Sequence, residues 1–350
     1  MYNTIDKKCY DSKNLFNYAN YIIRQEFIEN KKIINIKVDL DKQLQSHQLY
    51  KELGSQASQR VLFQLDKAWK SFLVAIKDYS KNPSKYLGRP KLPKYKKKDG
   101  RNLVMLKNIQ CRIENEYLTF SWKPLKQFNN MIKTRVTGKL IQVRFIPRGN
   151  CYVMEIVYDI DIPNTKEEIN NICGIDLGIN NLATLTNNVG ALPIIINGKP
   201  LKSINQYYNK HKAKIQSELK KKNNKDWSNK LSKLTLKRDN KIKNYIHSAS
   251  KNITNYCIDL NIDTIIIGLN KTWKQESELY DSTNQNFINI PFDKLIDMIK
   301  YKAENVGVKI IITEESYTSG TSFLDNEEPV KDNYDRSRRI FRGLFKSNKG

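Results

Sequence analysis

The sequence is poor in the residues that build disulfide-rich and zinc-binding proteins. Its 350 residues include 5 cysteines and 3 histidines. The cysteines are scattered, odd in number and never spaced as CxxC: Cys9, Cys111, Cys151, Cys173 and Cys257. This spacing argues against a disulfide framework and a zinc ribbon, and it predicts buried free thiols. The histidines show no metal-ligand spacing, so no chemistry is assigned to them.

Long apolar runs and acidic residues are also scarce. No run approaches the roughly 20 residues of a membrane-spanning helix, and residues 1–4 begin no signal peptide, so we expect a soluble cytoplasmic protein. Only 36 Asp and Glu oppose 61 Lys and Arg, which gives a net charge of +25. Because a polyanion would relieve this self-repulsion, nucleic acid is the expected partner and an anionic membrane the weaker alternative.

What the sequence does contain is enough apolar material for packed domains. Apolar residues make up 39% of the chain, and the length predicts two or three domains. One carboxylate, Asp176, stands alone in the apolar stretch 172–185. A carboxylate in a buried strand is costly unless it is paired, and a divalent cation is its usual partner. Metal or phosphate chemistry is therefore expected there. The alternative is that Asp176 only caps the following turn.

The first 100 residues favour a helical domain. Apolar residues recur at helical spacing over 12–29 and 55–79, and the second helix should end before Pro83. Polar residues outside these apolar stripes are candidates for nucleic-acid contact, although a solvated face is the alternative. The candidates are Arg24, Gln56, Gln59 and Arg60.

A cationic segment follows at 86–101. Prolines hold it extended, lysines supply phosphate contacts, and tyrosines supply stacking faces for unpaired bases. The alternative is a flexible charged linker. The candidate nucleic-acid residues in it are Arg89, Lys94, Tyr95, Lys96, Lys97 and Lys98.

Short strands dominate the next region, and the period changes from helical to alternating. Residues 101–165 are expected to form a small barrel or curved sheet, with Arg144 and Arg148 as further cationic candidates.

Beyond the stretch 172–185, a basic pair of helices is expected at 201–260. It is cationic on several faces, so it should lie along a phosphate backbone, with a solvated charged hairpin as the alternative. The candidate residues are Tyr207, Tyr208, Lys210, Lys237, Arg238 and Lys241.

The remainder reads as α/β. Strands are expected at 263–268 and 308–313 with a helix after Pro291, and strand–helix alternation is typical of α/β domains. Carboxylates at strand ends are where an open sheet places its site. No further strand or helix is expected beyond Thr318.

Several ordered segments resemble the TnpB family, transposon-encoded RNA-guided DNA endonucleases related to the type V CRISPR effectors. The segments are 174–181, 199–210, 247–250, 267–275 and 314–322. The resemblance implies an α/β multidomain protein with a helical recognition lobe (1–100), a wedge-like β-barrel (101–165) and a RuvC-like domain of RNase H fold (172–350). It also implies a guide RNA and a double-stranded target DNA as partners in a prokaryotic cytoplasm or nucleoid. Asn180, Trp273 and Lys274 join the nucleic-acid candidates on this basis.

Departures from the family concern the acidic ligands. Many members place the second acid where this sequence has Gly268, and a subset resembles this chain in using Glu315, or Glu314, instead. Members also continue past 345–350 to a third acid, whereas this sequence ends at Gly350, so we expect a C-terminally truncated RuvC-like domain. Two acids, Asp176 and Glu315, would hold one Mg²⁺ weakly and a second ion poorly. Substitutes would have to come from a polar tail: Asp325, Asp332 and Asp335.

The resulting hypothesis is an RNA-guided DNA-binding protein with a vestigial nuclease site, similar to the TnpB-like repressors (TldR) that occupy a target and block transcription. Helices 12–29 and 55–79 are candidates for contact to a short DNA motif beside the target. The first alternative is an active Mg²⁺-dependent RNA-guided DNA endonuclease. A phosphate loop of the actin–sugar kinase type and a non-specific nucleic-acid chaperone are the others.

Overall fold

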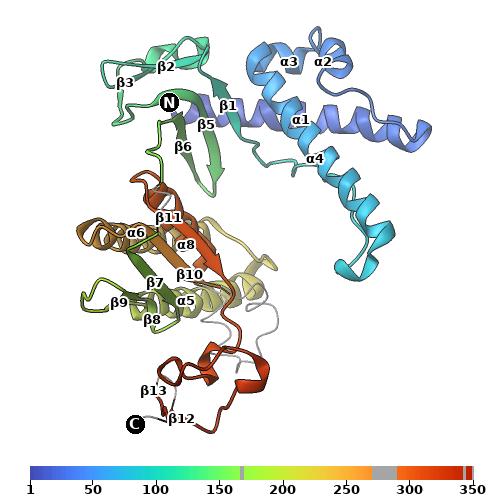
Figure 1. Cartoon of the computed structure of the whole chain (residues 1–350). Helices are drawn as coiled ribbons and strands as arrows, with labels where there is room; N and C mark the ends of the chain where they lie inside the picture. The colour runs from blue at the N-terminus through green and yellow to red at the C-terminus, as the bar shows by residue number, and fades with distance from the viewer. Residues whose placement is uncertain (166–168, 270–289, 342–343, 349–350) are drawn as a thin grey trace. The chain divides into compact units, whose positions relative to one another are not determined.

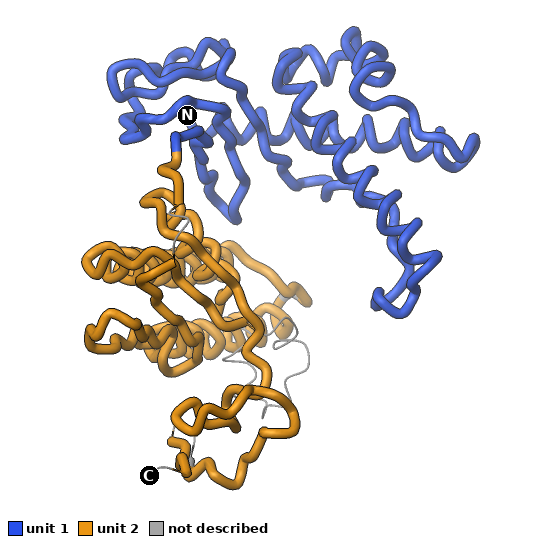
Figure 2. The backbone as a smooth tube through the Cα atoms, in the orientation of Figure 1, with its two compact units in different colours: residues 1–161 blue, residues 162–350 orange. Residues whose placement is uncertain are grey.

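The computed structural model describes residues 1–165, 169–269, 290–341 and 344–348 (Figure 1). It divides the chain into two compact units, Met1–Asp161 and Ile162–Gly350 (Figure 2). Four cysteines are buried and free, as expected, whereas Cys151 is half-buried. Among the described residues, no helix has the length and apolar character that crossing a membrane requires.

Two long helices shape the first unit. Helix α1 spans Tyr2–Asn30 and α4 spans Ser55–Lys81, and between them lie α2 (Asp39–Leu44) and α3 (Gln48–Leu53). Helix α1 begins ten residues before the predicted start at 12, because Ile5 and Cys9 extend its buried stripe. A short 3₁₀ turn, Pro83–Lys85, ends this helical part.

The strands of the first unit form two antiparallel sheets rather than one continuous sheet. The first has the order β1-β5-β6, built from Val104–Lys107, Lys139–Arg148 and Cys151–Asp159. The second has the order β2-β3-β4, built from Cys111–Glu114, Tyr117–Phe120 and Ile132–Lys133. Helices and strands share one hydrophobic core, so the expected segments 1–100 and 101–165 pack together. The closed barrel stays a prediction.

A five-stranded mixed sheet forms the second unit. Its order is β11-β10-β7-β8-β9, and the strands are Lys309–Thr313, Thr264–Gly268, Ile172–Leu177, Asn181–Asn187 and Ile194–Asn197. Strands β7, β8 and β9 are antiparallel, whereas β10 and β11 run parallel to β7. The strands predicted at 263–268 and 308–313 are thereby confirmed.

Three described helices accompany this sheet: α5 (Lys199–Asn223), α6 (Asn229–Asp259) and α8 (Phe292–Glu304) (Figure 1). Side chains of α6 and α8, including Ile253 and Leu295, are buried in one cluster with Ile175 and Ile265 of the sheet. This shared core fixes the position of β7 and β10, and with it the carboxyl ends of both strands.

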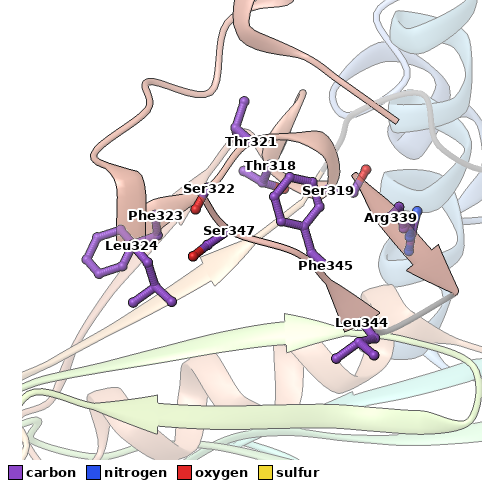
Figure 3. Close-up of a pocket in the computed structure, with 10 residues that line it drawn as sticks. All are labelled: Thr318, Ser319, Thr321, Ser322, Phe323, Leu324, Arg339, Leu344, Phe345 and Ser347. Carbon is purple, nitrogen blue, oxygen red and sulfur yellow. The ribbon is translucent and has the colours of Figure 1, made fainter. Parts of the chain in front are cut away.

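The segment beyond Thr318 contains more structure than expected. Three short 3₁₀ turns, Thr318–Gly320, Phe323–Asp325 and Lys331–Asn333, precede a hairpin of β12 (Arg339–Phe341) and β13 (Leu344–Phe345). The prediction of no further strand was wrong, because strands of two or three residues show no detectable period. A cavity of about 330 Å³ lies within this segment (Figure 3).

Candidate metal centre and nucleic-acid interface

Asp176 lies on β7 between two buried neighbours, Ile175 and Leu177. Its own side chain is exposed, because successive side chains of a strand point to opposite faces. The strand is buried as predicted, but the carboxylate lies on its accessible face. Partial burial raises the pKa of Asp176, while hydrogen bonds from Glu315 and from the backbone of Leu177 lower it.

Glu315 follows β11, and β10 lies between β11 and β7. A Cβ built on Gly268, the last residue of β10, would lie 2.1 Å from Glu315 Oε1 and 2.6 Å from its Cγ. The glutamate side chain therefore passes over Gly268 toward Asp176. The sequence left Glu314 and Glu315 as alternatives, and Glu315 is the one whose side chain is hydrogen-bonded to Asp176. Glu314 is exposed and accepts a hydrogen bond from the Ser316 hydroxyl at 3.0 Å.

The two carboxyl groups interact strongly. Burial, the charge of Asp176 and a hydrogen bond between the two side chains raise the pKa of Glu315 to about 7. At neutral pH the pair therefore tends to hold a proton, which a divalent cation would replace. Carboxylate oxygens are the ligands that Mg²⁺ prefers, so this donor set fits one such ion. Across the described ranges, no cluster of three His, Cys, Asp or Glu side chains has the spacing of a metal site.

Of the three tail aspartates, Asp325 and Asp335 have other partners, and Asp332 is exposed. Asp325 accepts hydrogen bonds from the backbone N–H of Asn348 and from Arg338, which also pairs with Glu327. The Asn348 N–H, the Ser322 hydroxyl and Arg338 hold the pKa of Asp325 at about 2. Asp335 accepts hydrogen bonds from the backbone and hydroxyl of Ser337. These bonds belong to the fold of the segment, and they do not bring the aspartates to the carboxylate pair.

The cationic segment near 93–98 is fastened to α1. Asn17 bonds both backbone groups of Lys96, donating to its carbonyl at 2.9 Å and accepting from its N–H at 2.8 Å. Asn20 and Arg24 donate to the Pro93 carbonyl at 3.0 and 2.7 Å. The backbone between Pro93 and Lys98 is therefore bound to α1 at several points. Arg24, a candidate for nucleic-acid contact, instead hydrogen-bonds the Pro93 carbonyl and lies over the Tyr95 ring.

Sequence reasoning missed the role of Lys13, which donates to the Lys98 carbonyl at 2.8 Å. The polar spacing Lys13, Asn17, Asn20 and Arg24, at intervals of three and four residues along one helix face, was the signal. The candidates predicted in the wider stretch 86–101 have exposed side chains: Arg89, Lys94, Tyr95, Lys96, Lys97 and Lys98.

Three of the other candidates of the first unit contact neighbouring side chains within the protein: Gln59, Arg60 and Arg144. Gln59 donates to Asp41 at 3.3 Å, and the Arg60 guanidinium lies 4.9 Å from the Phe63 ring. Burial lowers the pKa of Arg60. Arg144 pairs with Glu155 at 3.7 Å. Gln56 is half-buried, and Arg148 is exposed at the end of β5.

Of the candidate residues predicted on α5 and α6, some pack between the two helices and the others are exposed. Arg238 donates twice to Asn205 Oδ1, at 3.0 and 2.8 Å, and lies 5.4 Å from the Tyr208 ring. Arg238 and Tyr208 therefore hold the helices together. The others are exposed: Tyr207, Lys210, Lys237 and Lys241. Asn180 accepts a hydrogen bond from Lys202 at 3.0 Å. Trp273 and Lys274 lie outside the described residues.

Comparisons with known proteins find a transposase family, a TnpB-like relative and a structure of similar fold. Residues 155–274 match a family described as a probable transposase, OrfB_IS605. The TnpB-like protein ORF457 of Acidianus two-tailed virus is 26% identical over 348 residues, which cover 88% of this chain and 73% of the viral protein. A cryo-EM structure of a Cas12f1–sgRNA–target DNA complex aligns with a TM-score of 0.54 at 14% identity, covering 98% of this chain and 79% of that one. This last likeness shows a shared fold.

Proposed function

We propose, starting from the relationship to the TnpB family that the sequence matches support, that this chain is an RNA-guided DNA-binding protein. A guide RNA supplies sequence specificity by base pairing with the target strand, and the protein holds the heteroduplex through its backbone. The Cas12f1 structure, which shares the fold, is a complex with sgRNA and target DNA. The partners proposed for this chain are accordingly a guide RNA and a double-stranded DNA target.

The observation that carries the proposal is the cationic surface of α5 and α6. Most lysines of this pair are exposed, and the ion pairs found among the described residues include none of the lysines between 210 and 243. Charges that form no ion pair among the described residues are available for phosphates, and such contacts bind a nucleic-acid backbone of any sequence. The sheet order, with three antiparallel strands followed by two parallel ones, is consistent with an RNase H-like domain.

We also propose that this chain acts without cleavage, as a guide-directed transcriptional repressor in the manner of the TnpB-like repressors. Hydrolysis with two metal ions requires carboxylates that hold both ions. In the described part of the chain, Asp176 and Glu315 form a group of two. They fit one Mg²⁺ but leave a second ion poorly held, whereas binding of a guide and target does not require the metal.

The test is a binding experiment on the protein purified with its co-purifying RNA. Sequencing that RNA identifies the guide, and a duplex that matches the guide should be retained far better than a scrambled duplex. Retention should survive EDTA. Equal retention of both duplexes would instead favour a non-specific nucleic-acid chaperone.

A second candidate function, Mg²⁺-dependent RNA-guided cleavage, is favoured by the Glu315 position itself. The glutamate occupies the space above Gly268 and restores a carboxylate beside Asp176. Incubation of the ribonucleoprotein with target plasmid and Mg²⁺ separates the candidates. Nicked or linear product that disappears in Asp176→Ala would establish the nuclease, and intact plasmid under full occupancy supports the repressor.

A further inference from the structure

We propose that the turn between α5 and α6 is a base-stacking site for single-stranded nucleic acid. Trp227 supplies the aromatic face, and the surrounding lysines bind the phosphates. The inference deepens the proposed function, on which it rests for its ligand class.

The indole of Trp227 is held at one edge by a hydrogen bond, and about half of the residue is exposed. Its Nε1 donates to the Ser232 hydroxyl at 2.7 Å, and Ser232 is buried on α6. The start of α6 is itself fixed, because the Ser228 hydroxyl accepts the backbone N–H of Leu231 at 3.2 Å. Trp227 nevertheless remains 53% exposed. A half-exposed tryptophan whose N–H is hydrogen-bonded is typical of a binding surface.

Lysines flank Trp227 in the sequence, on both helices and in the turn between them. Lysines 220, 221 and 222 form the last turn of α5, Lys225 lies in the turn, and Lys230 and Lys233 follow on α6. All six are exposed. Between residues 219 and 238, Asp226 is the single acidic residue in the sequence. The turn therefore combines a fixed aromatic face with a dense positive field.

This combination matches an unpaired nucleobase and its flanking phosphates. Stacking needs an exposed base face, which a duplex offers only at its ends, and aromatic stacking tolerates any base. An anionic membrane would also attract lysines and tryptophan. The nucleic acid is favoured because the exposed cations continue along α5 and α6 through Lys210, Lys237 and Lys241. Helix α6 alone has 31 residues, a length that suits an extended polyanion.

The test compares two probes on the full chain: an oligothymidylate and an oligomer of the same length made of abasic sites. Trp227→Ala should weaken binding of the oligothymidylate roughly 5- to 100-fold and leave the abasic oligomer unaffected. Trp227→Phe should retain most of the affinity, whereas Trp227→Leu should not. Since the phosphate contacts are untouched, the salt dependence of binding should stay that of the wild type.

Lysine variants should behave in the opposite way. Replacing lysines 220, 221 and 222 by glutamine should weaken both probes and lower the slope of log affinity against log salt by up to about 2. Ser232→Ala removes the hydrogen bond that holds the indole edge. It should reduce the affinity for the oligothymidylate and leave the affinity for the abasic oligomer unchanged. Leu192→Ala is the matched surface control, because Leu192 is 85% exposed in the same unit and away from this turn in sequence.

Unchanged oligothymidylate binding in Trp227→Ala would overturn the proposal. The proposal would also be overturned if Trp227→Ala lost affinity only for phosphatidylserine vesicles, because that result would assign the turn to membrane binding. Guide-dependent retention of a matched duplex is measured separately on the same variants. If it persists while Trp227→Ala is neutral, only the stacking site is wrong. If it fails while Trp227→Ala is defective, only the guided function is wrong.

Discussion

At Gly268 the missing side chain allows Glu315 to reach Asp176. The resemblance to TnpB leads us to expect the second acid at Glu315 or Glu314 because residue 268 is a glycine, and Glu315 follows β11 while Gly268 ends β10. Because Glu315 Oε1 lies 2.1 Å from where a Cβ of residue 268 would be, an acid at 268 and the present Glu315 position exclude each other. The carboxylate that lies beside Asp176 of β7 is thus supplied by the segment after β11.

Gly268→Ala should displace Glu315 without unfolding the protein. The colliding atoms are the far end of a flexible side chain, so the glutamate can move away while the sheet remains intact. We expect affinity for Mn²⁺, measured by calorimetry, to fall roughly 10- to 100-fold.

Gly174→Ala on the neighbouring strand is the control for this variant. Its Cβ would meet Thr186 Cγ2 at an ordinary 3.5 Å, so metal affinity should be preserved. If Gly268→Ala binds Mn²⁺ as tightly as wild type, Glu315 is not a ligand.

Titration of Glu315 should appear in the stability of the metal-free protein. Its pKa rises from 4.5 to about 7 on folding, first because of burial and then because of Asp176. The stabilisation is complete below pH 4.5 and is lost as pH rises through 7, since the unfolded state releases its proton first. Relative to Glu315→Gln, wild type in EDTA should therefore lose stability over this range.

Denaturant unfolding at several pH values measures this difference. Mg²⁺ should restore the stability of wild type, but not of Glu315→Gln, at the alkaline end, because the ion replaces the proton between the two carboxylates. A wild-type curve parallel to that of Glu315→Gln would show that the pair does not share a proton.

At the scale of elements, α1 acts as a scaffold for the cationic segment 93–98. Its side chains bond the backbone of a chain some 70 to 85 residues away in sequence, at Pro93, Lys96 and Lys98. The side chains of Lys94, Lys97 and Lys98 are exposed on this fixed backbone, whereas Tyr95 is covered on one side by Arg24. A backbone held in place lowers the entropic cost of binding a ligand.

Asn17→Ala should release the segment selectively. It removes the two bonds to Lys96, whereas Asn20 also accepts from the buried Trp69 and would disturb the core. We expect a stability loss of about 1 kcal/mol, faster proteolysis between residues 91 and 101, and weaker RNA binding. Asn30→Ala, which loses only a local bond to Glu26, is the control. Proteolysis of Asn17→Ala at the wild-type rate would contradict the scaffold role.

Arg338 has a similar role in the segment beyond Thr318. It joins Asp325 and Glu327 and donates to the Lys346 carbonyl at 3.2 Å. Arg338→Gln should leave two carboxylates without their cation and speed trypsin or chymotrypsin cleavage of this segment. Arg336→Gln, whose parent side chain bonds only Tyr334 among the described contacts, should not. Equal cleavage of both variants would mean that Arg338 does not organise the segment.

The sequence predicted the elements whose apolar pattern is long and left out those whose pattern is short. The strand around Asp176 and the alternation of β10, α8 and β11 were visible because each buries a regular stripe or run. Strands β12 and β13 were not, since two or three residues carry no period. The passage of Glu315 over Gly268 was also invisible, because it depends on strand order rather than on spacing in the chain.

At the scale of the whole molecule, both units have exposed cationic residues. The net charge of the whole chain is +25. Charge alone favours binding to any nucleic acid and falls steeply with salt. Guided recognition adds a sequence-dependent component that salt reduces much less, because it resides in base pairs between guide and target. The two contributions can therefore be separated by raising the salt concentration.

The most direct test is the ratio of affinities of the purified ribonucleoprotein for a guide-matched and a scrambled duplex, measured by filter binding at physiological salt. We expect a ratio far above one that grows as salt is raised and that persists in EDTA. A ratio of one at every salt concentration would contradict this expectation.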